Sequence, residues 1–210
     1  MKRLQAGDTL LEIGAGLGQN LAYMAEAGAP TDKMYAVDSR LEVWNLGRRL
    51  FPLKYGIQGK TTVPQFIEAD LVAGWWSEKF LAKHGQVDIV LAGQFFDTMA
   101  DEYGLTILRW LKPLLRKDAI VVGWQVAADE PFTSELGVFY HNQLSFWGNW
   151  QGISIHQGPK PVVFQLDSWQ EVDLEKDWGW IEAEWRWIDQ KDMKGVYYHV
   201  NVEKSMQQSG

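Results

Sequence analysis

The amino-acid sequence predicts an α/β fold with a doubly wound, mostly parallel sheet and an antiparallel hairpin at its C-terminal end. Three observations predict this fold. Short apolar stretches alternate with helix-like stretches through about residue 126, as in a parallel sheet covered on both faces. Residues 180–189 and 195–205 alternate polar and apolar side chains around a polar turn, as a hairpin does. The 210 residues are near the size of one α/β domain.

The first four elements are a strand, a helix, a strand and a helix. TLLEIG (9–14) is short and apolar and ends in glycine, which indicates a strand, and NLAYMAEAG (20–28) spaces its apolar residues at helical intervals. KMYAVD (33–38) indicates the second strand. LEVWNLGRRLF (41–51) places apolar side chains on roughly one face and indicates the second helix.

The same alternation continues through the middle of the chain. QFIEAD (65–70) indicates a strand, and AGWWSEKFLAKHG (73–85) indicates a helix that ends in glycine. VDIVLAG (87–93) has the uninterrupted apolar character of a buried strand. DEYGLTILRWLKPLL (101–115) indicates an amphipathic helix, and AIVVGWQV (119–126) the fifth strand.

Composition and charge narrow the function classes. The chain has 20 basic and 27 acidic residues, a net charge of −7, which disfavours a nucleic-acid partner. Cysteine is absent, which excludes disulfides, zinc-thiolate sites and thiol nucleophiles, and no two histidines have metal-ligand spacing. No segment has the roughly 18 uninterrupted apolar residues of a membrane span, and the first residues do not resemble a signal peptide. We therefore expect a cytoplasmic protein without a membrane, nucleic-acid or metal partner.

A glycine-rich loop follows the first predicted strand. In LLEIGAGLGQNL (10–21), Gly14, Gly16 and Gly18 alternate with other residues just before a predicted helix. Such a loop lets a ligand approach the backbone at a helix N-terminus, at the carboxyl edge of the sheet. A tight turn with no ligand also selects glycine. Asp38 and Asp70 favour the ligand, because they close the next two strands, where an acid can accept hydrogen bonds from ribose hydroxyls.

The acid that precedes the loop helps to choose between two ligands. Glu12 would repel the pyrophosphate of a dinucleotide, whereas it would stabilise the cationic methionine end of S-adenosylmethionine. The alternate glycines also depart from the dinucleotide fingerprint, which has two residues before its third glycine. The loop therefore favours S-adenosylmethionine.

Four stretches resemble known motifs. LLEIGAGLG, YAVD, FIEAD and VDIVLAGQFF look like motifs I to IV of the class I S-adenosylmethionine-dependent methyltransferases, whose fold is Rossmann-like, and the match covers residues 8–127. The longer run from EIGAGLG to YAVD, the pair Phe95-Phe96, VVGWQV and FYHNQLSFW together resemble the fungal methyltransferases of polyketide and meroterpenoid biosynthesis. Those enzymes commonly methylate a carboxylate or hydroxyl of a secondary metabolite.

The resemblance implies roles for individual residues. For the cofactor, Glu12 and the three glycines would line the methionine end, and Gln94 would face the sulfonium. The ribose and the adenine would each be held by a pair of residues, namely Asp38 with Ser39 and Asp70 with Leu71. The substrate would meet an aromatic wall that includes Phe95, Phe96, Tyr140 and Trp147. This chain has Asp97 where the family pattern has a histidine, so the role of that position is open.

The C-terminal third is expected to hold the substrate or lid segment. VFYHNQLSFWGNW (138–150) indicates an aromatic-rich helix, and residues 138–170 are the segment where the family places its substrate helix. The first predicted strand begins by residue 9, so this sequence, which we treat as a single domain over 1–210, has no room for the lid helices that usually precede the sheet. His141 is the candidate base for a hydroxyl substrate, with a structural hydrogen bond as the alternative.

The sequence therefore predicts an S-adenosylmethionine-dependent O-methyltransferase that acts on a carboxylate or hydroxyl of a small apolar secondary metabolite. Two alternatives stay open. One is a methyltransferase-fold pericyclase or other cyclase that does not methylate. The other is a non-catalytic partner subunit, which the tryptophans at 178, 180, 185 and 187 suggest. Those tryptophans would suit core packing or a protein interface, such as a homodimer contact.

Overall fold

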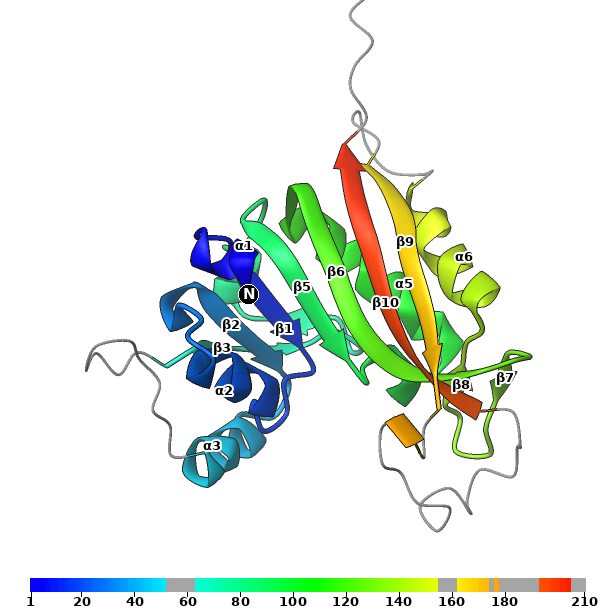
Figure 1. Ribbon diagram of the computed structural model, residues 1–210, viewed down its shortest axis with the longest axis horizontal. Coiled ribbons are helices and arrows are strands. Elements are labelled where there is room, and N and C mark those ends of the chain that lie inside the picture. Colours follow the sequence, from blue (N-terminus) through cyan, green and yellow to red (C-terminus); the bar gives the residue numbers. More distant parts are fainter. Residues whose placement is uncertain (52–62, 155–161, 174–175, 178–192, 205–210) are drawn as a thin grey trace, which may run out of the picture. The chain divides into compact units, whose positions relative to one another are not determined.

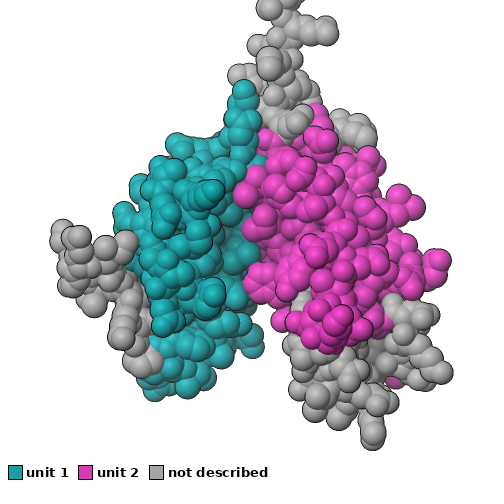
Figure 2. Space-filling view, viewed as in Figure 1, with its two compact units in different colours: residues 1–91, 110–119 teal, residues 92–109, 120–210 magenta. Residues whose placement is uncertain are grey.

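The computed structural model describes residues 1–51, 63–154, 162–173, 176–177 and 193–204. The chain divides into two compact units (Figure 2). Unit 1 comprises Met1–Leu91 and Trp110–Ala119, and unit 2 comprises Ala92–Arg109 and Ile120–Gly210. Each unit is described below by itself.

Unit 1 contains a largely parallel set of strands in the order β4-β3-β2-β1-β5 (Figure 1). The strands are β1 (Leu10–Ile13), β2 (Met34–Asp38), β3 (Gln65–Asp70), β4 (Trp75–Trp76) and β5 (Val87–Gly93). β1 pairs in parallel with both β2 and β5, and β2 pairs in parallel with β3. Every residue of β1 is buried, which explains its uninterrupted apolar run apart from Glu12.

Short helices connect these strands. They are α1 (Lys2–Gln5), α2 (Gln19–Glu26), α3 (Leu41–Leu50) and α4 (Glu78–Leu81), with 3-10 turns at Thr31–Lys33 and Lys112–Leu114. Trp44 of α3 is buried and stacks on Phe66 of β3, with ring centroids 5.6 Å apart. The predicted strands at 9–14, 33–38, 65–70 and 87–93 and the helices at 20–28 and 41–51 are confirmed.

The predicted helix over 73–85 is wrong in its first part. Oδ1 of Asp70 accepts hydrogen bonds from the backbone N–H groups of Val72 (3.0 Å) and Ala73 (2.8 Å), so the chain turns directly after β3. Residues 75–76 then pair with β3 as the antiparallel strand β4. The side chain of Trp76 stacks on Phe80, and only the four residues of α4 are helical.

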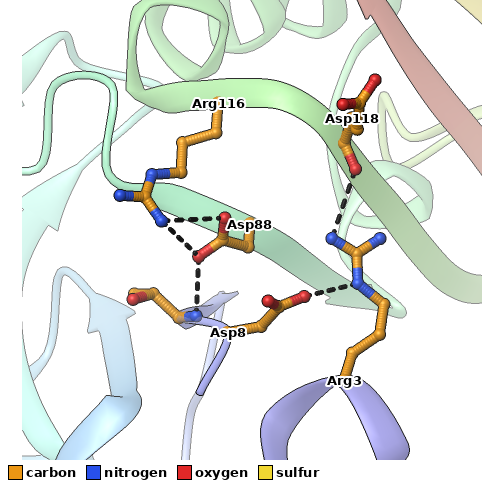
Figure 3. Close-up of polar contacts among 6 residues, drawn as sticks. Arg3, Asp8, Asp88, Arg116 and Asp118 are labelled. Atoms are coloured by element: carbon orange, nitrogen blue, oxygen red, sulfur yellow. Dashed lines mark hydrogen bonds and ion pairs between the residues drawn. The ribbon is translucent and has the colours of Figure 1, made fainter. Parts of the chain in front are cut away.

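A polar cluster fixes the N-terminal end of β1 (Figure 3). Oδ2 of the buried Asp88 accepts a hydrogen bond from the backbone N–H of Thr9 at 2.9 Å, and its Oδ1 lies 3.3 Å from Nη1 of Arg116. Arg3 of α1 forms an ion pair with Asp8 and donates to the carbonyl oxygen of residue 118 at 3.2 Å. The Asp88 contact holds the start of β1 against β5, and the Arg3 contacts tie α1 to Asp8 and to residue 118.

Unit 2 contains three long antiparallel strands in the order β6-β10-β9. They are β6 (Leu115–Ala128, whose first residues belong to unit 1), β9 (Val162–Val172) and β10 (Met193–Lys204). A small second sheet pairs β7 (Phe132–Thr133) with β8 (Phe139–Tyr140). The helices are α5 (Asp101–Leu111) and α6 (Gln143–Ser154), with a 3-10 turn at Phe96–Thr98, and α6 packs against β9.

The C-terminal predictions are partly confirmed. The strand predicted over 195–205 is β10, and the expected mostly parallel α/β sheet with antiparallel C-terminal strands is observed. The neighbours of β10 are β6 and β9, while its predicted hairpin partner 180–189, like the tryptophans at 178–187, lies outside the described residues.

The helix predicted over 138–150 begins later than expected. Oδ1 of Asn142 accepts a hydrogen bond from the backbone N–H of Ser145 (2.9 Å), and the backbone N–H of Asn142 donates to Oγ of Ser145 (3.1 Å). This reciprocal cap starts α6 at Gln143 and leaves Tyr140 on β8. No helix in the described part of the chain is long and apolar enough to cross a membrane.

Candidate functional site

The glycine loop between β1 and α2 has a backbone that other residues rarely adopt. Gly14, Gly16 and Gly18 have φ angles of 65°, 52° and 73°, all in the left-handed region. A Cβ atom on Gly18 would lie 2.3 Å from the Trp44 ring, whereas one on Gly16 would meet nothing within 4 Å. Gly18 is therefore required by packing as well as by backbone conformation, and the open side of Gly16 leaves room for a ligand.

Glu12 is a buried acid with one unsatisfied oxygen. Its Oε1 accepts a hydrogen bond from Nδ2 of Asn20 at 2.7 Å, and its Oε2 has no hydrogen-bond partner in the described structure. Burial raises the pKa of Glu12 to about 8, the hydrogen bond from Asn20 opposes the rise, and the charge of Asp38 adds to it. A buried oxygen without a donor is costly unless a ligand supplies one. A cationic ligand group fits this position.

Asp38 ties the end of β2 to the glycine loop. Its Oδ2 accepts a hydrogen bond from the backbone N–H of Gly16 at 2.9 Å, and its Oδ1 accepts one from the backbone N–H of Arg40 at 2.9 Å. A carboxylate has about four acceptor positions, so both oxygens can still accept from ligand hydroxyls. The neighbouring Ser39 is exposed.

Asp70 lies at the same carboxyl edge, one strand further along. It is half-buried, and its Oδ1 makes the turn after β3, which leaves Oδ2 for a further donor. Leu71, which follows it, is buried. Unit 1 thus carries eight of the predicted cofactor residues on the ends of three adjacent parallel strands and the turns after them, namely Glu12, Gly14, Gly16, Gly18, Asp38, Ser39, Asp70 and Leu71.

The remaining predicted residues belong to unit 2. Gln94 is exposed and has a φ of 47°, which is strained for a residue with a side chain, and its backbone N–H donates to the carbonyl oxygen of Trp124 at 2.6 Å. Phe95 is half-buried, and Phe96 is buried with its ring edge-on to Phe146 at 5.9 Å. Of the paired phenylalanines, Phe96 belongs to the core of the unit.

Tyr140 and His141 are both buried. Tyr140 stacks on Phe132 with ring centroids 5.3 Å apart. Nδ1 of His141 lies 3.1 Å from Oγ of Ser145, and its Nε2 lies 3.9 Å from Oδ1 of Asp101. Burial lowers the pKa of His141 to about 4, although the charge of Asp101 opposes the change. A neutral imidazole has a free acceptor nitrogen, and the role of His141 as a base stays a prediction.

Trp147 lines a pocket of 430 Å³ in unit 2. The half-buried indole lies on α6. The pocket is lined by apolar and charged side chains, among them Asp129, Leu144, Trp147, Leu166, Glu171 and Lys194. Of the predicted substrate residues, the pocket contains Trp147 but not Phe95, Phe96 or Tyr140.

Two buried polar residues of unit 2 were not assigned a role from the sequence. Asp97 is 8% exposed, and its Oδ2 accepts a hydrogen bond from the backbone N–H of Val126 at 2.6 Å. Burial raises the pKa of Asp97 to about 6. Gln125 on β6 is fully buried, and neither amide atom has a partner in the described structure. Gln125 was not singled out from the sequence, because one polar residue leaves the apolar pattern of the strand AIVVGWQV unchanged.

Comparison with known proteins adds relatives of low identity. No protein-family model matches the chain. The chain is 26% identical to methyltransferase adrK of Penicillium roqueforti over 180 residues, which are 82% of this chain and 62% of that protein. It is 29% identical to O-methyltransferase phiE of a fungal species over 163 residues, 74% of this chain and 52% of that protein. The chain thus spans between half and two thirds of the length of these relatives.

Solved structures show the fold. An S-adenosylmethionine-dependent methyltransferase from Methanosarcina mazei superposes on 92% of this chain and 92% of its own, with a TM-score of 0.63 and 12% identity. The chain has the class I methyltransferase fold. The same fold occurs in the cyclase SpnF, which matches 93% of this chain and 76% of its own with a TM-score of 0.64 and 13% identity. The predicted resemblance to fungal methyltransferases is confirmed as distant homology, and the predicted class I fold is confirmed.

Proposed function

We propose that this chain binds S-adenosylmethionine through unit 1 and transfers its methyl group to an oxygen of a small apolar metabolite. The observation that carries the proposal is the unpartnered Oε2 of Glu12, buried beside a glycine loop. Burial raises the pKa of this carboxyl to about 8 and so favours its protonated form. A bound ammonium group would favour the carboxylate and satisfy it.

The other groups of unit 1 suit the rest of the cofactor. The free acceptor positions of Asp38 match the two hydroxyls of a ribose, and the turn at Asp70 supports the adenine side of the site. Gly16 leaves space above the loop, where a side chain would stand. Under this proposal the ammonium group of the cofactor pairs with Glu12, and its ribose hydroxyls donate to Asp38.

When bound, S-adenosylmethionine supplies an electrophilic methyl group, and alignment of the acceptor oxygen with that group accounts for most of the catalysis. A carboxylate acceptor needs no base. A hydroxyl must lose its proton, and we propose His141 as its acceptor because a neutral imidazole carries one acceptor nitrogen. The name of one relative, O-methyltransferase phiE, supports transfer to oxygen.

A cyclase is the second candidate function. It is favoured by the structural match to SpnF, whose fold is the same and whose activity is a cyclisation. Under this alternative the chain would bind S-adenosylmethionine without consuming it.

Calorimetry tests the binding step. Titration of S-adenosylmethionine into the full chain should give saturable one-to-one binding, and Glu12→Gln should weaken it by about tenfold or more, because a charge-assisted contact is lost. Glu26→Gln, on the exposed end of α2, is the matched control and should bind as the wild type does. No heat at high micromolar ligand, with the fold confirmed by circular dichroism, would refute the proposal.

Turnover separates the two candidate functions. Formation of S-adenosylhomocysteine with a panel of phenols, alcohols and carboxylic acids supports the methyltransferase, while bound cofactor that is never converted supports the cyclase. His141→Ala should slow methylation of a hydroxyl by about two to four orders of magnitude and leave methylation of a carboxylate unchanged. Equal rates on a hydroxyl substrate would remove His141 from the mechanism.

A further inference from the structure

The 430 Å³ pocket of unit 2 has the size and character of a small-molecule site. Its apolar surface comes from Leu144 and Trp147 of α6 and Leu166 of β9. Leu144 is 77% exposed, an unusual exposure for leucine, and it borders the same pocket as the half-buried indole of Trp147. A flat apolar molecule in this pocket would cover both side chains.

The charged side of the pocket is centred on Lys194 of β10. Its Nζ forms ion pairs with Asp129 and with Oε1 of Glu171, the latter at 2.9 Å. The side chain of Lys194 is 21% exposed, whereas those of Asp129 and Glu171 are 62% and 50% exposed. The ammonium is therefore the innermost charge, and the two carboxylates lie toward solvent. An ammonium has three N–H donors, so one remains for a ligand oxygen.

We propose that this pocket binds a neutral, flat, apolar molecule, with its ring system against Trp147 and an oxygen acceptor on Lys194. An anionic ligand would meet two carboxylates against a single ammonium, and a cationic ligand in the pocket would meet that ammonium, which is the innermost of the three charges. A neutral ligand avoids both repulsions and the cost of desolvating an ion. This binding needs no cofactor and goes beyond the proposed function. If the proposed methyl transfer holds, the preference of this pocket for a neutral ligand favours a substrate that carries a hydroxyl over one that carries a carboxylate.

Three probes with one ring system test the charge preference. Methyl 2-naphthoate is neutral, 2-naphthoate is anionic, and 2-naphthylmethylamine is cationic at pH 7. Calorimetry on the full chain should show saturable binding of the ester, at least about tenfold tighter than that of either ion. Lys194→Met keeps the aliphatic stem but removes the charge. In that variant the two carboxylates are uncompensated, so the cationic probe should become the tightest of the three.

Two variants locate the binding. Trp147→Ala should weaken the ester by about tenfold or more. Leu144→Asp should weaken it as well, and because Leu144 is a surface side chain this variant should fold normally. Tyr197→Ala is the control: Tyr197 is 43% exposed and, three residues from Lys194 on β10, lies on the opposite face of the sheet. It should bind the ester as the wild type does.

Several results would overturn the inference. They are the absence of saturable ester binding by folded protein, unchanged binding in both Trp147→Ala and Leu144→Asp, or tighter wild-type binding of either ion. Each variant is also titrated with S-adenosylhomocysteine. A wild-type protein that binds S-adenosylhomocysteine but not the ester counts against the pocket alone, whereas Glu12→Gln should weaken binding of S-adenosylhomocysteine and leave ester binding unchanged.

Discussion

The hydroxyl of Tyr198 donates a hydrogen bond to the carbonyl oxygen of Ala92 at 2.8 Å, through a gap that Gly123 leaves between them. Tyr198 is on β10 directly opposite Gly123 on β6. A Cβ atom on Gly123 would lie 2.1 Å from the Ala92 oxygen and 2.4 Å from the Tyr198 hydroxyl. The absence of a side chain at residue 123 is thus what allows this buried contact.

Gly123→Ala should destabilise the protein by several kcal/mol, because both the strand backbone and the buried tyrosine would have to move. Gly148→Ala is the matched control. Gly148 is exposed on α6, a Cβ there meets nothing within 4 Å, and alanine favours the helix, so that variant should be more stable by about 0.5–1 kcal/mol. Urea unfolding of the two variants measures both effects, and equal midpoints would contradict them.

Alanine substitutions at Gly16 and Gly18 of the glycine loop should differ in their effects on stability. Gly18→Ala has to accommodate a left-handed backbone and a clash with Trp44, whereas Gly16→Ala faces the backbone penalty alone, roughly 1–2 kcal/mol. Thermal unfolding should therefore show the larger decrease in melting temperature for Gly18→Ala. Calorimetry should show weaker S-adenosylmethionine binding for Gly16→Ala even where its fold is intact. A Gly16→Ala protein less stable than Gly18→Ala would be inconsistent with this geometry.

The buried Glu12 predicts a pH dependence of stability. Its folded pKa, about 8, lies above its ordinary value of 4.5, so between these pH values the folded state holds a proton that the unfolded state has lost. This contribution is fully present below pH 4.5 and is lost as the pH rises through 8, at up to about 1.4 kcal/mol per pH unit. Glu12→Gln should therefore gain stability relative to the wild type as the pH rises from 5 to 8. Urea unfolding at several pH values measures the difference. Parallel curves for the two proteins would contradict the expectation, and Glu26→Gln controls for the loss of one carboxylate.

His141 predicts the opposite trend in the acid range. Its folded pKa of about 4 lies below the ordinary 6.5, so the unfolded state binds the extra proton between those values. The stability is fully present above pH 6.5 and decreases as the pH falls toward 4. His141→Asn should lose less stability than the wild type over this range. The control is His199→Asn, whose ring pairs with Asp167 at a partly exposed position and should follow the wild type.

Much of the fold could be predicted from the sequence because β1 and β5 are buried on both faces. In VDIVLAG the first six residues are buried, and even Asp88 among them has its charge paired with Arg116. The errors occur where a side chain, not the hydrophobic period, decides the backbone. Asp70 turns the chain before two tryptophans that fit a helical pattern equally well. The reciprocal contacts of Asn142 and Ser145 move the start of α6, and that signal, an Asn followed three residues later by Ser, is visible in the sequence.

The residues of the candidate site could likewise be predicted from the sequence only in part. Glu12, Asp38 and Asp70 could be predicted because each closes or nearly closes a strand, and parallel strands end at one edge. Lys194, Asp129 and Glu171 could not, because their meeting depends on the pairing of β10 with both β6 and β9, which no local pattern encodes. Asp97 was visible only as a departure from the family pattern, and its burial depends on tertiary packing.

The irregular pairing of β9 with β10 has a consequence for solubility. Among the described strands β9 has a neighbour on one side only, and eleven residues of open edge would invite pairing with another chain. The register shifts between His199 and Val200, so Asp167 is an extra residue on β9, and its carboxylate bonds the His199 ring at 3.0 Å. A bulge and a charge in the middle of an edge strand both discourage aggregation through strand addition, which protects this edge at high concentration.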